Sequence, residues 1–270
     1  MSARQVLRLE TCSFSHDGGR DYNEDAVGSS HAFGAVHLFM LADGAGGQGG
    51  GDVAAQIAIR VASREFSRLP VFSSETLLRC MKAADREIAA RQSTGTQLAR
   101  MAATFVAALI DAHSRQLLIG NLGDSRCYVF RGAQIVGQSY DHSLVQRFID
   151  AGLYPAERLR QHPKRNVLYA SLGANLEGVE PYVSPQPLVL EAGDGVLLCS
   201  DGVWELLDEP TLGRLHAQSP TVEAWRDLLV SAVRGRMAPG HDNFSALLVR
   251  CDLVQITDDE RTLPPTLVTV

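Results

Sequence analysis

Long basic runs, paired cysteines and long apolar segments are all missing from this 270-residue sequence. With 25 Lys and Arg against 31 Asp and Glu, the net charge is −6, and no basic stripe favours nucleic acid as a partner. The five cysteines are scattered without a CxxC pair or a histidine spacing suited to zinc, which indicates buried, reduced thiols. No apolar run is long enough to span a bilayer, and MSARQVLRLE lacks the apolar core of a signal peptide. We therefore expect a cytoplasmic protein that binds neither nucleic acid nor membrane.

Internal repeats, low-complexity tracts and interdomain linkers are also missing, so we expect one domain. QVLRLETCSF alternates like a half-buried strand, and TFVAALIDA, QLLIGNLGD and RCYVFRGAQIVG are strand-like runs whose short connections require antiparallel pairing. We predict helices at 53–69, with Asp52 as N-cap, and at 75–91, 204–207, 209–217 and 222–234. The pattern predicts an α+β protein, mainly antiparallel sheet with helices outside, and a loosely held tail beyond about Asp258.

A glycine-rich segment, FMLADGAGGQGGGD, follows one of the apolar runs, and Gly44, Gly46 and Gly49 match the dinucleotide-binding pattern GxGxxG. That fold needs a second parallel strand after the helix, with an acidic residue about 20 positions on. Here the predicted helix is followed by RLPVFSSE and another helix, so we reject dinucleotide binding, which an NAD(P)H titration would test. No Gly-Lys-Ser/Thr follows these glycines, which excludes a P-loop.

Aspartates recur where buried apolar runs meet tight turns: Asp25, Asp43, Asp124, Asp201 and Asp242. Any one of them has an ordinary explanation as a turn or cap residue. Their recurrence indicates a shared site, where like charges repel strongly unless cations lie between them. Oxygen ligands without histidine or thiolate favour magnesium, manganese or calcium. Asp25, Asp43, Asp201 and Asp242 balance the charge of two divalent ions, and the Gly44 carbonyl can turn toward an ion.

Six stretches follow one another along the chain: GGRDYNED, LADGAGG with GGGDVA, NLGDSRCYVF, DHSLVQRFIDAG with HPKRNV, GDGVLLCSDGVWE and HDNFSALLV. In this order they resemble the bacterial form of the metal-dependent protein serine/threonine phosphatases of type 2C, the PPM family. The resemblance covers about residues 17–253. It implies an α-β-β-α sandwich of two antiparallel sheets flanked by helices. It also implies one phosphatase domain over 1–257, with a flap at about 142–173 and a tail at 258–270.

The resemblance also assigns roles to single residues. It implies that Asp25, Asp43, Asp201, Asp242 and the Gly44 carbonyl hold two Mn²⁺ or Mg²⁺ ions, with Asp124 at a third, weaker metal position. Arg20 matches the arginine that binds substrate phosphate, and Glu24 and Asn243 fit roles in supporting the ligands. On the flap, we expect Arg158, Arg160, Lys164 and Arg165 to form a solvated face.

The implied reaction is hydrolysis of phosphoserine and phosphothreonine by a metal-activated water, without a covalent phosphoenzyme. The implied partners are phosphorylated proteins, including a serine/threonine kinase or its targets, and we expect a monomer. The sequence departs from the family pattern at Ala45 and Gln48, where relatives often carry other residues, and in the stretches MAAT and NVLYASLG. The acid that protonates the leaving group stays open between water and Asp124. Two alternatives remain: a silent regulator that binds phosphoproteins, and a phosphatase of small metabolites.

Overall fold

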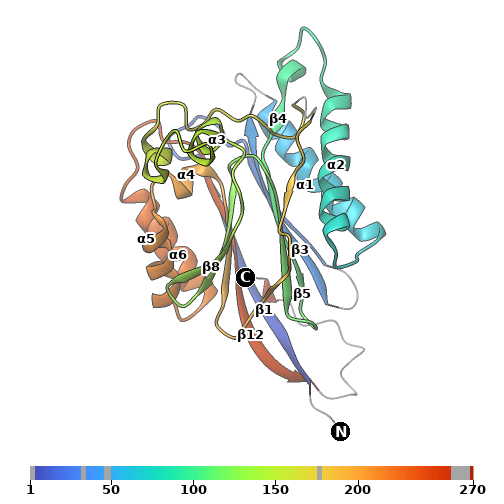
Figure 1. Cartoon of the computed structure of the whole chain (residues 1–270), viewed down its shortest axis with the longest axis vertical. Coiled ribbons are helices and arrows are strands. Elements are labelled where there is room, and N and C mark those ends of the chain that lie inside the picture. The colour runs from blue at the N-terminus through green and yellow to red at the C-terminus, as the bar shows by residue number, and fades with distance from the viewer. Residues whose placement is uncertain (1–3, 32–34, 46–49, 175–177, 257–267, 270) are drawn as a thin grey trace.

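The computed structural model describes residues 4–31, 35–45, 50–174, 178–256 and 268–269, which form two facing β-sheets with helices outside (Figure 1). The six-stranded sheet has the order β13-β1-β12-β11-β7-β8. Its strands are β1 (Arg4–His16), β7 (Arg126–Arg131), β8 (Gln134–Gln138), β11 (Gly195–Cys199), β12 (Phe244–Ile256) and β13 (Val268–Thr269). The seven-stranded sheet has the order β10-β6-β5-β3-β2, with β4 beside β3 and β9 beside β6. Its strands are β2 (Asp25–His31), β3 (Val36–Ala45), β4 (Ala102–Ala103), β5 (Phe105–Asp111), β6 (Gln116–Leu122), β9 (Tyr182–Val183) and β10 (Leu188–Val189).

Helices cover the outer face of each sheet. Two long helices, α1 (Gly51–Arg68) and α2 (Ser74–Arg91), lie on the seven-stranded sheet, and α4 (Asp201–Trp204), α5 (Glu209–Gln218) and α6 (Val222–Arg234) lie on the six-stranded sheet. The remaining helices are α3 (Leu144–Asp150) and the 3₁₀ turns η1 (Gln97–Arg100) and η2 (Ala156–Gln161). The α+β class and the α-β-β-α sandwich are therefore confirmed, with one parallel pairing, between β1 and β13.

The buried side chains of β3 explain why that strand reads as a continuous apolar run. Leu38 and Met40 pack under α1 and α2, whereas Phe39 and Leu41 pack between the two sheets. A strand alternates its side chains between faces, so a strand buried on both faces needs apolar residues at every position. β3 is thus fixed in the middle of the fold, and its end carries Asp43 to the edge of both sheets.

The start of α1 differs from the sequence prediction. The helix begins at Gly51, and its N-cap is Gly50, with φ of 102°, rather than Asp52. A left-handed backbone at the cap favours glycine. Asp52 lies one position into the helix, where a carboxylate still favours the positive end of the helix dipole.

The corner at Gly123, Asp124 and Ser125 corrects a second prediction. We expected the strands on either side to pair, but β6 and β7 belong to different sheets. Gly123, with φ of 112°, allows the chain to turn out of one sheet and into the other. Asp124 therefore lies, buried, at the corner where the chain passes from one sheet to the other. A third prediction was also shifted, because the helix expected at 204–207 begins at Asp201.

Most of the predicted tail, residues 258–267 and 270, lies outside the described residues. The described residues Val268 and Thr269 pair with Glu10 and Thr11 of β1. No helix in the described part of the chain is long and apolar enough to cross a membrane.

A histidine pair, in which His37 is buried and His31 is exposed, joins the end of β2 to the start of β3. His31 and His37 are register partners, their Nδ1 atoms lie 3.2 Å apart, and His37 is 3% exposed. Burial, and then the neighbouring His31, lower the pKa of His37 to about 4. The unfolded chain, whose histidines titrate near 6.5, therefore binds more protons than the folded chain between pH 4 and 6.5.

We expect His37 to make stability fall as the pH drops through that window. Between pH 6.5 and 4 the free energy of unfolding should fall by about 2–3 kcal/mol more in the wild type than in His37→Phe, which has no titrating ring at this position. Urea unfolding of both proteins at several pH values measures the difference, in which carboxyl titrations cancel. Parallel stability curves for the two proteins would contradict the role given to His37.

Candidate metal centre

The two sheets bring four of the expected aspartates to one edge of the sandwich. Asp25 begins β2 and is the register partner of Asp43 near the end of β3. Asp201 begins α4, two residues after the end of β11, and Asp242 lies two residues before β12. Two carboxylates therefore come from each sheet.

These carboxylates raise one another's pKa. Burial first, and then Asp25, Asp201, Asp124 and Asp242, hold the pKa of Asp43 well above its usual range. The pKa of Asp201 is raised by burial and then by Asp124, Glu205, Asp242 and Asp25. Burial raises the pKa of Asp25 to about 6 although serine hydroxyls lower it. A buried group of mutually repelling carboxylates is the electrostatic environment that a cation stabilises.

Hydrogen bonds hold the Asp25 carboxylate and the Asp43 backbone in place in the seven-stranded sheet. Ser200 donates its hydroxyl to Asp25 Oδ2 at 2.8 Å and accepts the Ser245 amide at 3.0 Å. The amide of Asp43 donates to Thr104 Oγ1 at 2.9 Å, and the Thr104 amide returns a bond to the Asp43 carbonyl at 2.8 Å. Sequence reasoning assigned no role to Ser200 or Thr104. Small hydroxyl residues beside a strand-end aspartate are the signal that could have found them.

The donor chemistry fits a hard divalent cation. Asp25 Oδ1 and Glu24 Oε1 are buried without a hydrogen-bond donor, although buried oxygens nearly always have one. The gathered side-chain groups are oxygen donors, which suits magnesium or manganese. In the described part of the chain, however, no three His, Cys, Asp or Glu side chains are already arranged to hold one ion. The residues thus fit the metal by chemistry and position, with side-chain adjustment still required.

The backbone packs tightly around Gly44. A Cβ at this residue would lie 2.3 Å from the carbonyl group of Gly51, so only glycine fits. The Gly44 amide donates to the Glu24 carbonyl at 3.1 Å, and Gly44 pairs with Ala103 of β4. The proposed carbonyl ligand therefore lies between the loop that precedes β2 and the start of α1.

Asn243 ties that loop to β12. Its side-chain oxygen accepts the Glu24 amide at 2.9 Å, and its Nδ2 donates to the carbonyls of Asp17 and Tyr22 at 2.9 and 3.0 Å. The intervening Arg20 is 54% exposed, and its Nη2 donates to Asp242 Oδ2 at 2.8 Å. An arginine with a free face thus stands at the open edge of the carboxylate group.

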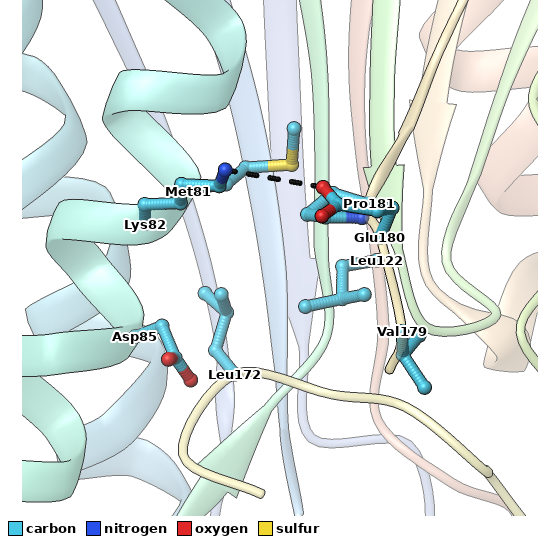
Figure 2. A pocket seen from close by; sticks show the side chains of 8 residues that line it. All are labelled: Met81, Lys82, Asp85, Leu122, Leu172, Val179, Glu180 and Pro181. Atoms are coloured by element: carbon cyan, nitrogen blue, oxygen red, sulfur yellow. Dashed lines mark ion pairs between the residues drawn. The ribbon is translucent and has the colours of Figure 1, made fainter. Parts of the chain in front are cut away.

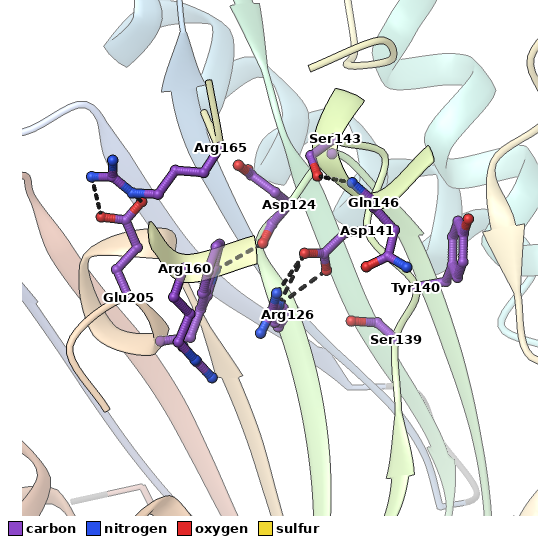
Figure 3. Close-up of polar contacts among 12 residues, drawn as sticks. Asp124, Arg126, Ser139, Tyr140, Asp141, Ser143, Gln146, Arg160, Arg165 and Glu205 are labelled. Atoms are coloured by element: carbon purple, nitrogen blue, oxygen red, sulfur yellow. Dashed lines mark hydrogen bonds and ion pairs between the residues drawn. The ribbon is translucent and has the colours of Figure 1, made fainter. Parts of the chain in front are cut away.

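Asp124 lies deeper and is supported by residues that sequence reasoning missed (Figure 3). Burial, and then Asp141, raise the pKa of Asp124 to about 7. Its carbonyl accepts the Trp204 indole N–H at 2.9 Å. The Arg126 guanidinium stacks 3.7 Å from the centroid of Trp204. It also binds both carboxylate oxygens of Asp141. A charged residue at the start of the apolar run RCYVF is the signal that could have found Arg126.

Ion pairs join the segment expected to form the flap to helices on the six-stranded sheet. Arg160 donates to Glu209 at 2.5 Å, and Arg165 donates to Glu205 Oε1 and Oε2 at 2.5 and 2.8 Å. The expectation that these arginines form a solvated face was therefore wrong for Arg160 and Arg165. The spacing of charged residues in the sequence predicts which face of a short helix is charged. It does not show which residue elsewhere in the chain neutralises that charge.

A small cavity lies between α2 and residues 178–183, next to the end of the segment expected to form the flap (Figure 2). Its volume is about 220 Å³, and its walls combine apolar side chains with Lys82, Asp85 and Glu180. Lys82 and Glu180 approach across it at 3.9 Å, and Asp85 accepts the Gly173 amide at 2.8 Å. The Gly173 end of the expected flap is thus bonded to α2. Gly46 and Gly49 of the rejected dinucleotide motif lie outside the described residues, and no strand separates α1 from α2.

Comparison with known proteins gives a consistent picture. The family model described as Protein phosphatase 2C matches residues 14–234. The serine/threonine phosphatase stp of Listeria monocytogenes is 32% identical over 252 residues, covering 90% of this chain and 96% of its own length. The serine/threonine phosphatase Stp1 of Staphylococcus aureus has a similar structure, with a TM-score of 0.80, 27% identity, and coverage of 90% of this chain and 94% of that one. The catalytic domain of the phosphatase PstP, solved in complex with two manganese ions, gives a TM-score of 0.75 at 28% identity, covering 92% of this chain and 100% of that domain.

Proposed function

The chain belongs to the protein phosphatase 2C family, and we propose that it is a metal-dependent phosphatase of phosphoserine and phosphothreonine in proteins. One observation carries the proposal: aspartates from the strand ends of both sheets gather at one edge and raise one another's pKa. A silent regulator would not need that costly arrangement of buried carboxylates, so the catalytic function is favoured.

We assign the two-metal centre to Asp25, Asp43, Asp201, Asp242 and the Gly44 carbonyl, and a third, weaker position to Asp124. Manganese or magnesium fits these oxygen donors. When bound, the two cations supply the Lewis acidity that activates a water molecule for attack on phosphorus. Glu24 and Asn243 keep the loop before β2 in place, since Asn243 accepts the Glu24 amide.

The protein's own residues bind and orient the substrate. The half-exposed Arg20 guanidinium can donate two hydrogen bonds to phosphoryl oxygens, a geometry that arginine supplies better than lysine. Ser200 keeps Asp25 oriented through its hydroxyl. Ala45 carries no ionisable group, which leaves water at the open edge beside Arg20, or Asp124, to give the leaving oxygen its proton.

The proposal extends to the whole chain. The phosphatase domain spans 1–257 with its flap at 142–173, and 258–270 is a tail. The partners are phosphorylated proteins, including a serine/threonine kinase or its targets, met in the cytoplasm by a monomer. The open, polar edge at Arg20 admits a protein chain as well as a small metabolite, and relatives named protein phosphatases favour the former.

We expect the protein with manganese to release phosphate from phosphothreonine and phosphoserine peptides at least about tenfold faster than from a matched phosphotyrosine peptide. A denaturing quench during turnover should trap no phosphorylated protein, because water attacks directly. Phosphate release is measured against the same peptides in chelator. Accumulation of a phosphoprotein would contradict direct attack, and failure to cleave any of the phosphopeptides would overturn the proposed function.

A further inference from the structure

A groove runs along the outer side of the six-stranded sheet, between β1 and α6. Its volume is about 840 Å³, and Phe14 and Val230 contribute apolar walls. The polar lining comes from His16 on β1 and from Arg226 and Arg234 on α6, with Asp227 and Ser231 beside them. We refer to this feature as the α6 groove.

The charges of the α6 groove are unequal. Arg226 Nε donates to Asp227 at 2.8 Å, and its Nη1 contacts Cys12 Sγ at 3.2 Å, so its charge is partly neutralised. Arg234 is exposed and makes no ion pair or side-chain hydrogen bond with the described residues. An anionic group lying in the groove would therefore find its main partner in Arg234.

The distance between the two arginines along the groove matches the length of a short extended peptide. Arg226 lies beside Cys12, and Arg234 lines the same groove as His16, which is four residues further along β1. Eight helical positions separate the two arginines, which is about 12 Å along α6. An extended chain covers that distance with about four residues.

The end of the groove at His16 adjoins the candidate metal centre. His16 packs against Phe244 with ring centroids 4.9 Å apart. The Gly19 amide, in the loop that follows, donates to the carbonyl of His241 in the segment before β12 at 2.8 Å. Arg20 is four residues beyond His16, so their backbones are at most about 14 Å apart. A peptide with its phosphoryl group at Arg20 can thus reach Arg234 with its fourth or fifth residue.

We propose that the α6 groove binds the polypeptide next to the phosphorylated residue and favours acidic side chains about four and eight positions away. The inference rests on the proposed function, because it makes this groove an extension of the same substrate site. An overall charge of −6 repels acidic substrates, so a local cationic groove is what allows the protein to accept them. The phosphoryl group itself is left to Arg20 and the carboxylate centre.

Binding of fluorescent phosphothreonine peptides, followed by anisotropy in chelator, tests the groove without requiring turnover. One peptide carries Asp at the fourth and eighth positions N-terminal to phosphothreonine, one carries them C-terminal, and matched peptides carry Asn. We expect one of the two Asp peptides to bind about fivefold more tightly than its Asn match at low salt, and the preference to fade at high salt. Arg234→Glu should abolish the preference.

Arg236→Glu is the matched control, since Arg236 is exposed two residues further on and does not line the groove. It should preserve the preference. Equal binding of all Asp and Asn peptides to the wild type, or an equal loss in Arg236→Glu, would overturn the inference. Peptides that bind with the expected preference but release no phosphate with manganese would overturn the proposed function instead and leave the groove standing.

Discussion

Asp201→Asn should lower kcat/KM for a phosphothreonine peptide in manganese by about a thousandfold or more. Asp201 is 8% exposed, and its pKa is raised by burial and by the neighbouring carboxylates, so it belongs to the proposed two-metal centre. Asparagine keeps the shape and removes one of the four charges that balance two cations. The loss of charge stabilisation where negative charge develops in the transition state has this order of magnitude. Phosphate release at several manganese concentrations measures it.

A second readout separates metal binding from catalysis. In chelator the variant should unfold at a temperature equal to or above that of the wild type, because one of the mutually repelling buried carboxylates is gone. Manganese at a hundred times its Kd should stabilise the wild type by about 2.7 kcal/mol and the variant much less. Asp252→Asn, on the far part of β12, is the control and should behave as the wild type does. A variant that retains manganese-dependent turnover within tenfold would remove Asp201 from the centre.

The strands and helices could be predicted from the sequence where a single physical rule determines the structure. Both faces of β3 are buried, so an apolar run identified it, and the helix at 75–91 was found from its stripe with an error of one residue. The corner at Gly123 could not be predicted in the same way. A short connection permits pairing of its flanking strands, but whether they pair depends on which sheet each joins, and that is decided by packing far along the chain.

The residues of the candidate site also divide into those that could be predicted from the sequence and those that could not. Strand-end aspartates such as Asp43 and Asp201 were predictable because a lone buried carboxylate is costly and needs a partner. Their supports were not, since Ser200 and Thr104 act only through neighbours that the fold brings close. The pairing of Arg165 with Glu205 was likewise hidden, because a salt bridge between residues 40 positions apart leaves no local pattern.

Arg126→Met should lower the free energy of unfolding by about 3–5 kcal/mol, the cost of leaving one member of a buried ion pair without its partner. The side chains of Arg126 and Asp141 are 5% and 2% exposed, and their closest atoms are 2.7 Å apart. Methionine fills much of the arginine's volume but leaves the Asp141 carboxylate buried and unpaired. It also removes the guanidinium that stacks on Trp204. Urea unfolding in chelator measures the loss.

The double variant Arg126→Met with Asp141→Leu distinguishes the effect of the lost ion pair from the effect of lost side-chain packing. Replacing both charges by apolar groups should recover a large part of the lost stability, because the penalty comes mainly from the unpaired carboxylate. Arg8→Ala is the matched control: the side chains of Arg8 and its partner Asp252 are 44% and 34% exposed, so the loss should stay below about 1 kcal/mol. If Arg126→Met costs no more than Arg8→Ala, Arg126 does not hold this region together. The consequence reaches the site, because the Trp204 that Arg126 supports holds the carbonyl of Asp124 through its indole N–H.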